Sequence, residues 1–102
     1  MAPAERIVAR IMGCGSSGGV PRVGNHWGAC DPTNPKNRRS RCSLLITGTR
    51  AGSDGATRVV IDTGCDLREQ LLAAEVGELD AVLYTHAHAD HTHGIDDLRV
   101  LA

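Results

Sequence analysis

Aromatic residues are almost absent from this sequence: among its 102 residues there is no phenylalanine, one tryptophan and one tyrosine. Trp27 and Tyr84 are therefore its only aromatic side chains, and much of the 41% hydrophobic content is alanine. The apolar area that such a chain can bury on its own is modest. We therefore expect the isolated chain to be marginally stable or to self-associate through an exposed contact face.

Long apolar runs are also missing. No segment approaches the roughly 18 apolar residues of a membrane span, and the N-terminus lacks the hydrophobic region of a secretory signal. We therefore expect no membrane partner and a cytoplasmic location. The cysteines are widely spaced and form no C-x-x-C pair, which favours reduced thiols over a disulfide framework; they are Cys14, Cys30, Cys42 and Cys65.

The sequence has no excess of charge of either sign, with 11 basic and 12 acidic residues and a formal net charge of −1. We therefore expect no bulk attraction to nucleic acid. Positive charge is concentrated only between Lys36 and Arg41. Arg38, Arg39 and Arg41 are candidate ligands for the phosphate of a small-molecule phosphoester substrate. A solvated charge run is the more common explanation of such a cluster, and both interpretations stay open.

Residues 85–94 read T-H-A-H-A-D-H-T-H-G and contain four of the five histidines. Imidazole and carboxylate groups at this density favour binding of zinc-like or manganese-like ions. In an extended segment alternate side chains share a face, so His86 and His88 can converge on one ion, and Asp90 and His91 can turn toward a second. The alternative is a histidine-rich surface loop, but the apolar run that precedes these residues favours a loop positioned at the end of a strand.

The pattern His86-x-His88-x-Asp90-His91 resembles the signature of the metallo-β-lactamase superfamily. Asp62, at the end of the apolar segment 59–61, matches the aspartate of an upstream strand in that family, and residues 12–21 resemble its phosphodiesterase branch, which contains phosphoribosyl 1,2-cyclic phosphodiesterase. The resemblance implies an α/β fold, the N-terminal half of a four-layer α/β/β/α sandwich. Because that domain needs on the order of 200 residues, we expect residues 1–102 to be the N-terminal portion of one domain, with its C-terminal half and later metal ligands missing.

The same resemblance implies two divalent ions, zinc or manganese, with His86 and His88 on the first and Asp90 and His91 on the second. Asp90 would also serve catalysis, and Asp62 would orient a ligand histidine. His93, two residues beyond the motif, would either support the ligands in the same way or face solvent. The implied activity is hydrolysis of a small cyclic or nucleotide-like phosphodiester by a metal-bridging hydroxide. A thioesterase or lactonase of the same fold, or a non-catalytic metal-binding fragment, is the alternative. The fragment alone is expected to be inactive.

Periodicity and turn residues predict strands over residues 6–12, 43–47, 58–62 and 79–84, of which the second and third form a hairpin. They also predict a long surface loop over residues 23–41, a helix that Asp66 caps and Gly77 stops, and a second helix from Ile95. Residues 13–18 satisfy G-x-G-x-x-G, but Pro21 follows where a helix should begin. We therefore reject a dinucleotide site and expect a loop able to approach an anion closely.

Overall fold

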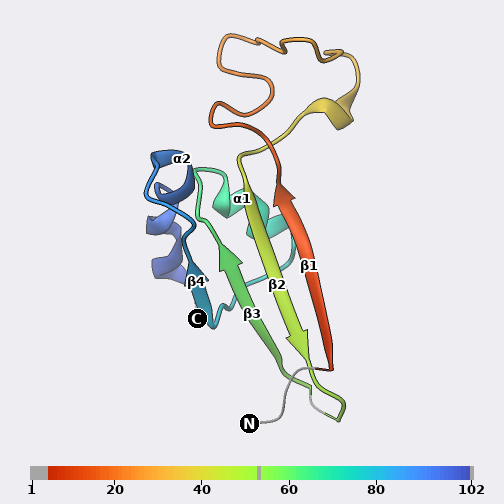
Figure 1. Cartoon of the computed structure of the whole chain (residues 1–102), viewed down its shortest axis with the longest axis vertical. Helices are drawn as coiled ribbons and strands as arrows, with labels where there is room; N and C mark the ends of the chain where they lie inside the picture. The colour runs from red at the N-terminus through yellow and green to blue at the C-terminus, as the bar shows by residue number, and fades with distance from the viewer. Residues whose placement is uncertain (1–4, 53, 102) are drawn as a thin grey trace.

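The computed structural model describes residues 5–52 and 54–101. Its elements follow in the order β1 (Arg6–Gly13), η1 (Pro35–Asn37), β2 (Ser43–Thr49), β3 (Ala56–Ile61), α1 (Leu67–Ala73), β4 (Ala81–Leu83), α2 (Ala89–Thr92) and η2 (Ile95–Val100), where η marks a 3-10 helix (Figure 1). All four predicted strands are present. No helix in the described part of the chain has both the length and the apolar character that crossing a membrane requires.

The strands form one sheet in the order β1-β2-β3-β4. β1 and β2 are antiparallel, as are β2 and β3, which form the predicted hairpin, whereas β4 runs parallel to β3. The carboxyl ends of β1, β3 and β4 consequently meet at one edge of the sheet (Figure 1). The glycine-rich loop, Asp62 and the histidine motif each follow one of these strands, so the topology brings three distant segments to that edge.

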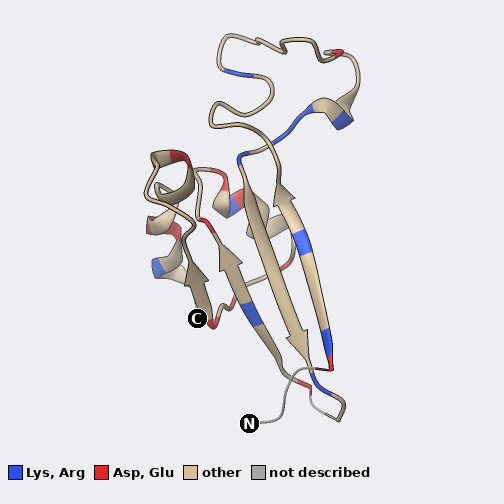
Figure 2. Ribbon diagram, in the orientation of Figure 1, with Lys and Arg blue, Asp and Glu red and all other residues tan. Residues whose placement is uncertain are grey.

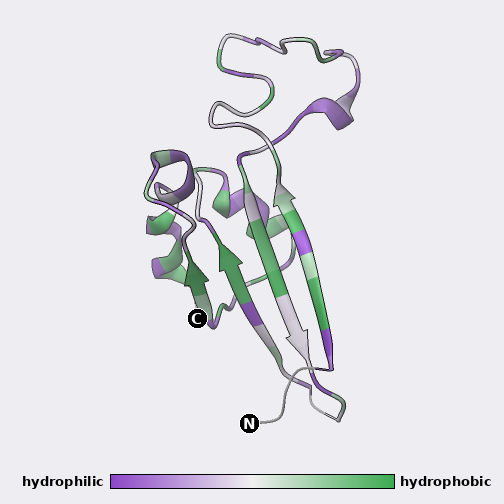
Figure 3. Ribbon diagram, viewed as in Figure 1, coloured by the Kyte–Doolittle hydropathy of each residue, from purple (hydrophilic) through white to green (hydrophobic). Residues whose placement is uncertain are grey.

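Helix α1 covers one face of the sheet. The buried core consists of Leu45 and Val60 from the sheet and Leu67 and Leu71 from α1. The opposite face, which carries alternate residues of β1, is open: Ile7 is 68% and Ile11 70% exposed. In Figure 3 the hydrophobic segments of β1 are green and alternate with purple, hydrophilic ones. The chain thus has one helical layer and one sheet layer, as expected for one half of a four-layer α/β/β/α sandwich.

The predicted extent of the first helix was wrong. α1 ends at Ala73 rather than near Gly77, because the chain there forms the hydrogen bonds Glu75 N to Leu72 O, at 3.1 Å, and Val76 N to Leu71 O, at 3.0 Å. These are the two bonds of a Schellman motif. Its left-handed position is filled by Glu75, with φ of 57°, so no glycine marks the end of this helix.

Two further local predictions also need correction. Asp66 occupies the N-cap position of α1, but its side chain makes no capping hydrogen bond, because Arg41 binds both carboxylate oxygens. The segment from Ile95 forms the 3-10 helix η2 rather than an α-helix. The predicted long loop is confirmed: between β1 and β2 the chain extends beyond the sheet (Figure 1) and contains only the single turn η1 and isolated bridges.

Candidate metal centre

Asp62 lies at the edge of the sheet where the carboxyl ends of β1, β3 and β4 meet. It follows β3 directly, is only 4% exposed and adopts a left-handed φ of 69°, a conformation that aspartate tolerates better than most residues. One carboxylate oxygen accepts the backbone N–H of Thr85 at 2.9 Å, and the other accepts the Thr85 hydroxyl at 2.8 Å. His91 Nδ1 lies 2.8 Å from that second oxygen. Asp62 therefore joins the ends of β3 and β4 to α2.

These contacts determine the ionisation of Asp62. Burial by itself raises the pKa of the carboxyl, but three hydrogen bonds from Thr85 and His91, with the attraction of a charged His91, outweigh burial and place the pKa below its ordinary value of 3.8. Asp62 is therefore a carboxylate near neutral pH. Because a carboxylate only accepts hydrogen bonds, His91 presents Nδ1–H to it, and the lone pair of the neutral ring lies on Nε2.

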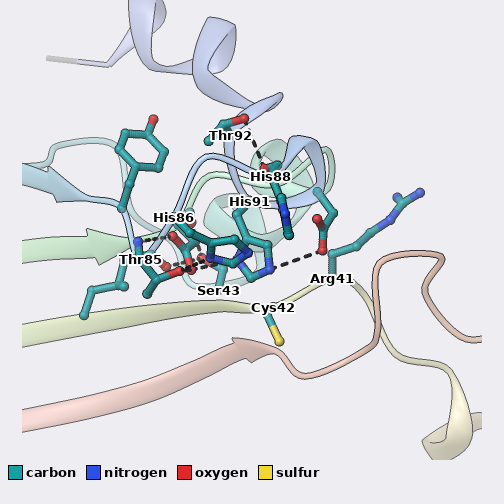
Figure 4. A network of polar contacts seen from close by, with 12 residues as sticks. Arg41, Cys42, Ser43, Thr85, His86, His88, His91 and Thr92 are labelled. Carbon is teal, nitrogen blue, oxygen red and sulfur yellow. Dashed lines mark hydrogen bonds and ion pairs between the residues drawn. The ribbon is translucent and has the colours of Figure 1, made fainter.

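His86 is oriented in a similar way by Thr85. The Thr85 hydroxyl donates its hydrogen to Asp62, so at the 2.8 Å contact with His86 Nδ1 it acts as the acceptor. Nδ1 of His86 then carries the proton, which leaves Nε2 as its electron-pair donor. The His86 ring lies 4.5 Å from that of His88 and 4.2 Å from that of His91, between ring centroids. Figure 4 shows the three rings together beside Arg41.

Asp90 and His91 provide the clearest test of whether an ion fits. His91 Nε2 and Asp90 Oδ2 lie 3.2 Å apart. In the protonated ring this contact is an ion pair, whereas in the neutral ring with Nδ1–H toward Asp62 the Nε2 lone pair faces the carboxylate oxygen, and a metal ion can replace the proton between the two atoms. Two donors held at about 2.0–2.1 Å by a tetrahedral ion are separated by roughly 3.3 Å. The spacing of this pair and the chemistry of its donors therefore fit a divalent metal ion.

A complete coordination shell is not formed by these side chains. Within residues 5–52 and 54–101, no group of three or more His, Cys, Asp and Glu side chains is arranged so that it could hold an ion. The structure brings His86, His88, Asp90 and His91 to one edge of the sheet, the histidine edge, with Asp62 in contact with His91. The exposed side chain of His93 makes no hydrogen bond among the described residues. The assignment of these residues as ligands and supports stays a prediction.

Two glycines allow the segment after β3 to pack against the histidine motif. A Cβ atom on Gly64 would lie 2.6 Å from the carbonyl oxygen of Asp90, and one on Gly94 would lie 1.8 Å from the carbonyl oxygen of Gly64. Backbone bonds connect the same segments: Thr63 N to His91 O and Gly94 N to Thr63 O are both 2.8 Å. The position of α2 therefore depends on the absence of side chains at residues 64 and 94.

The structure separates the candidate arginines into two groups. Arg41 is bound through its backbone N–H and guanidinium to Asp66, at 2.9 and 3.1 Å, and through Nε to Ser17 O at 3.2 Å. It thereby connects the glycine-rich loop to α1. Arg38 and Arg39 are exposed and make no ion pair in the described part of the chain. All three line a cavity of about 530 Å³ with Ser40 and Asp66.

Sequence reasoning did not identify the contact of Thr85 with Asp62 or that of Asp66 with Arg41, which organise this edge. Thr85 lies directly before His86 at the end of a strand, and that position was the available signal. Nothing in the sequence pairs Asp66 with Arg41, since the two are 25 residues apart. The four cysteines are free and exposed.

Comparison with known proteins agrees with this architecture. Residues 57–102 match the family described as "Beta-lactamase superfamily domain". The chain is 41% identical to a solved structure described as a new diphosphatase from the PhnP family, with a TM-score of 0.79. The match covers 94% of this chain and 36% of the diphosphatase. Together with the fold and the histidine edge, these matches show that the chain belongs to the metallo-β-lactamase superfamily. Within it, the chain is similar to the PhnP family.

Two curated proteins are also similar. An octanoyltransferase from Porphyromonas gingivalis is 44% identical over 91 residues, 89% of this chain and 18% of that protein. A ribonuclease Z from Bradyrhizobium is 36% identical over 66 residues, 63% of this chain and 20% of that protein. The chain therefore spans about a fifth of the length of these curated relatives.

Proposed function

We propose that the chain provides the first ligand set of a dinuclear metal-dependent hydrolase that acts on a small cyclic or nucleotide-like phosphodiester. The observation that carries this proposal is the contact of His91 with two carboxylates, Asp62 at Nδ1 and Asp90 at Nε2. The carboxylate of Asp62 orients the imidazole ring, and the carboxylate of Asp90 would offer an oxygen to the same metal ion as His91 Nε2. His86 and His88 supply the other imidazoles of the edge.

Each residue has a distinct part in this proposal. Bound divalent ions, zinc or manganese, would supply the positive charge that makes water nucleophilic near neutral pH and stabilises an anionic transition state. Asp62 keeps the proton of His91 on Nδ1, and Thr85 keeps that of His86 on Nδ1, so both rings offer Nε2. His86 and His88 would bind one ion, and Asp90 and His91 the other.

The loop between β1 and β2 indicates the class of substrate. The cavity beneath the loop is lined by Arg38 and Arg39, whose guanidinium groups suit phosphate. Arg41 is less suited to bind substrate, because Asp66 and Ser17 already occupy its donors. The similarity to a diphosphatase and to a ribonuclease, both named for hydrolysis at phosphate, supports the same class.

An acyl substrate is the second candidate, and one observation favours it: the similarity to an octanoyltransferase extends over 89% of this chain. A thioesterase or lactonase would use the same residues, since divalent ions also polarise a carbonyl group. The arginine-lined cavity argues for phosphate over this alternative. Assays on a cyclic phosphodiester, a thioester and a lactone distinguish the two.

The test combines metal content with hydrolysis. Protein loaded with zinc or manganese is dialysed, its bound metal is measured by elemental analysis, and turnover of a cyclic phosphodiester is followed. We expect two ions per chain where the remaining ligands are present, and loss of both metal and turnover in His88→Ala and Asp90→Ala. Asp96→Ala, which removes an exposed carboxylate of η2, is the matched control. Retained turnover in both histidine-edge variants would contradict the proposal.

A further inference from the structure

A second group of arginines lies away from the histidine edge, on the face of the sheet that α1 covers only in part. Arg6 and Arg10 of β1 and Arg58 of β3 line a groove of about 360 Å³. Figure 2 shows these three basic positions on the two strands. The groove is closed on its other side by the residues that follow α1, Ala74 to Val76.

The register of the sheet explains why the three side chains face one groove. Val8 of β1 pairs with Thr47 of β2, which in turn pairs with Arg58 of β3. Directly paired residues lie on the same face, and so do Arg6 and Arg10, which flank Val8 at intervals of two. Arg6 and Arg10 are thus about 13 Å apart along the strand, and Arg58 lies two strands away, about 10 Å from Val8. Three long cationic side chains therefore surround Val8 and Thr47.

The guanidinium groups of these arginines are not paired with carboxylates, and the one acidic side chain bound to any of them is Asp80, which accepts the backbone N–H of Arg58 at 2.8 Å in the described part of the chain. No ion pair involves any of the three within residues 5–52 and 54–101; the basic residues in such pairs are Arg41, Arg68, His91 and Arg99. Among the described residues, their only side-chain hydrogen bond is a long contact of 3.5 Å from Arg10 to the carbonyl oxygen of Ala73. Glu75 lines the groove but is not paired with them. Most guanidinium donors around this groove are therefore free to bind an anion.

The lining also provides neutral donors. The hydroxyl-bearing residues Thr47 and Thr49 lie at the floor of the groove, beside Leu45 and Val8. Guanidinium groups match the oxygens of phosphate through paired N–H donors, and hydroxyl groups add further hydrogen bonds. Three arginines opposed by one glutamate suit an anion with several charges better than a single carboxylate.

We propose that this groove is an anion site for a small oligophosphate group, such as pyrophosphate or the phosphate chain of a nucleotide. It is independent of the proposed hydrolytic site, because none of its residues contacts the histidine edge or the cavity of Arg38 and Arg39. Its occupancy needs no metal ion at the histidines.

The test is calorimetric titration of the full chain with inorganic pyrophosphate, at low salt and with EDTA present to exclude bridging metals. We expect one site, with affinity about tenfold or more weaker in Arg10→Gln and in Arg58→Gln, since each substitution removes charge-assisted hydrogen bonds to the phosphate oxygens. Arg58→Lys, which keeps the charge without the planar group, should bind with intermediate affinity. ATP as titrant shows whether a nucleotide or a free oligophosphate is preferred.

Controls separate this site from general attraction of anions. Arg99→Gln removes an exposed arginine that pairs with Asp96, and it should bind pyrophosphate as the wild type does. Arg39→Gln tests the cavity assigned to substrate. Absence of binding, equal weakening by Arg99→Gln, or weakening by Arg39→Gln alone would each overturn the proposal. Circular dichroism confirms that the variants remain folded.

Discussion

His91 Nδ1 lies 2.8 Å from a carboxylate oxygen of Asp62, although the two residues are 29 positions apart in the chain. The contact connects the end of β3 to the short helix α2 and fixes which ring nitrogen of His91 is available to a ligand. Because Asp62 is buried, this orientation is set by the fold rather than by solvent.

Replacing Asp62 by asparagine should weaken metal binding. An amide can accept from His91 Nδ1 but no longer carries the charge that increases the basicity of Nε2. Losses of about 10–100-fold in metal affinity are typical for such supporting carboxylates. Competition titration with a chromogenic chelator measures the change. Asp96→Asn, in the exposed η2, is the control and should leave affinity unchanged; equal affinity of Asp62→Asn and the wild type would disprove the orienting role.

The pH dependence of stability should also depend on Asp62. Its pKa is lowered in the folded chain, so the ionised form stabilises the fold above the unfolded pKa of about 3.9. That stabilisation is lost as pH falls through the lower folded value. Urea denaturation of the metal-free chain between pH 7 and pH 3 should show the loss below about pH 4. Asp62→Asn should be less stable at pH 7 and show a flatter decline, whereas an unchanged slope would contradict this assignment.

Gly94→Ala should strongly destabilise the chain. The new methyl group would meet the carbonyl oxygen of Gly64 at 1.8 Å, so the histidine motif must move away from the segment after β3. We expect a loss of about 3 kcal/mol or more in the free energy of unfolding. Gly77→Ala is the matched control, since nothing lies within 4 Å of the position of its Cβ. A Gly94→Ala variant as stable as Gly77→Ala in thermal denaturation would be incompatible with this packing.

Arg41 and Arg39 should respond differently to substitution. Arg41→Ala removes the hydrogen bonds to Asp66 and Ser17, and should lower the free energy of unfolding by about 1–3 kcal/mol. Arg39→Ala removes an exposed side chain and should leave stability unchanged while weakening low-salt binding of a phosphate ester. Denaturation and titration of both variants separate the two roles. Equal affinity of Arg39→Ala and the wild type would remove Arg39 from the proposed substrate site.

The open face of the sheet should promote self-association of the chain. Ile7 and Ile11 are about two-thirds exposed, at 68% and 70%, and lie on the face that α1 does not cover. Analytical ultracentrifugation should detect concentration-dependent association that Ile7→Lys combined with Ile11→Lys reduces. Val23→Lys is the control, because Val23 is 95% exposed but lies in the long loop. A wild-type chain that stays monomeric across the concentration range would count against this expectation.

Much of the architecture follows from local pattern. Strand periodicity and turn residues located all four strands and the β2–β3 hairpin, because alternation of apolar side chains is a local property. The helix ends were less accessible. Glu75 takes the left-handed position that a glycine usually fills, so no glycine in the sequence marks where α1 stops. Spacing placed the histidines and Asp90 after a strand, but it could not determine their hydrogen-bond partners.

The residue pattern alone therefore specified the strands and the donor types of the histidine motif, and the family resemblance drew attention to Asp62. Only the folded chain decided that Asp62 contacts His91, that Arg41 is occupied by Asp66, and that Arg6, Arg10 and Arg58 share a groove. Each of these relationships joins residues on separate elements, so it depends on strand order and register. Those are fixed by long-range pairing, which no local spacing encodes.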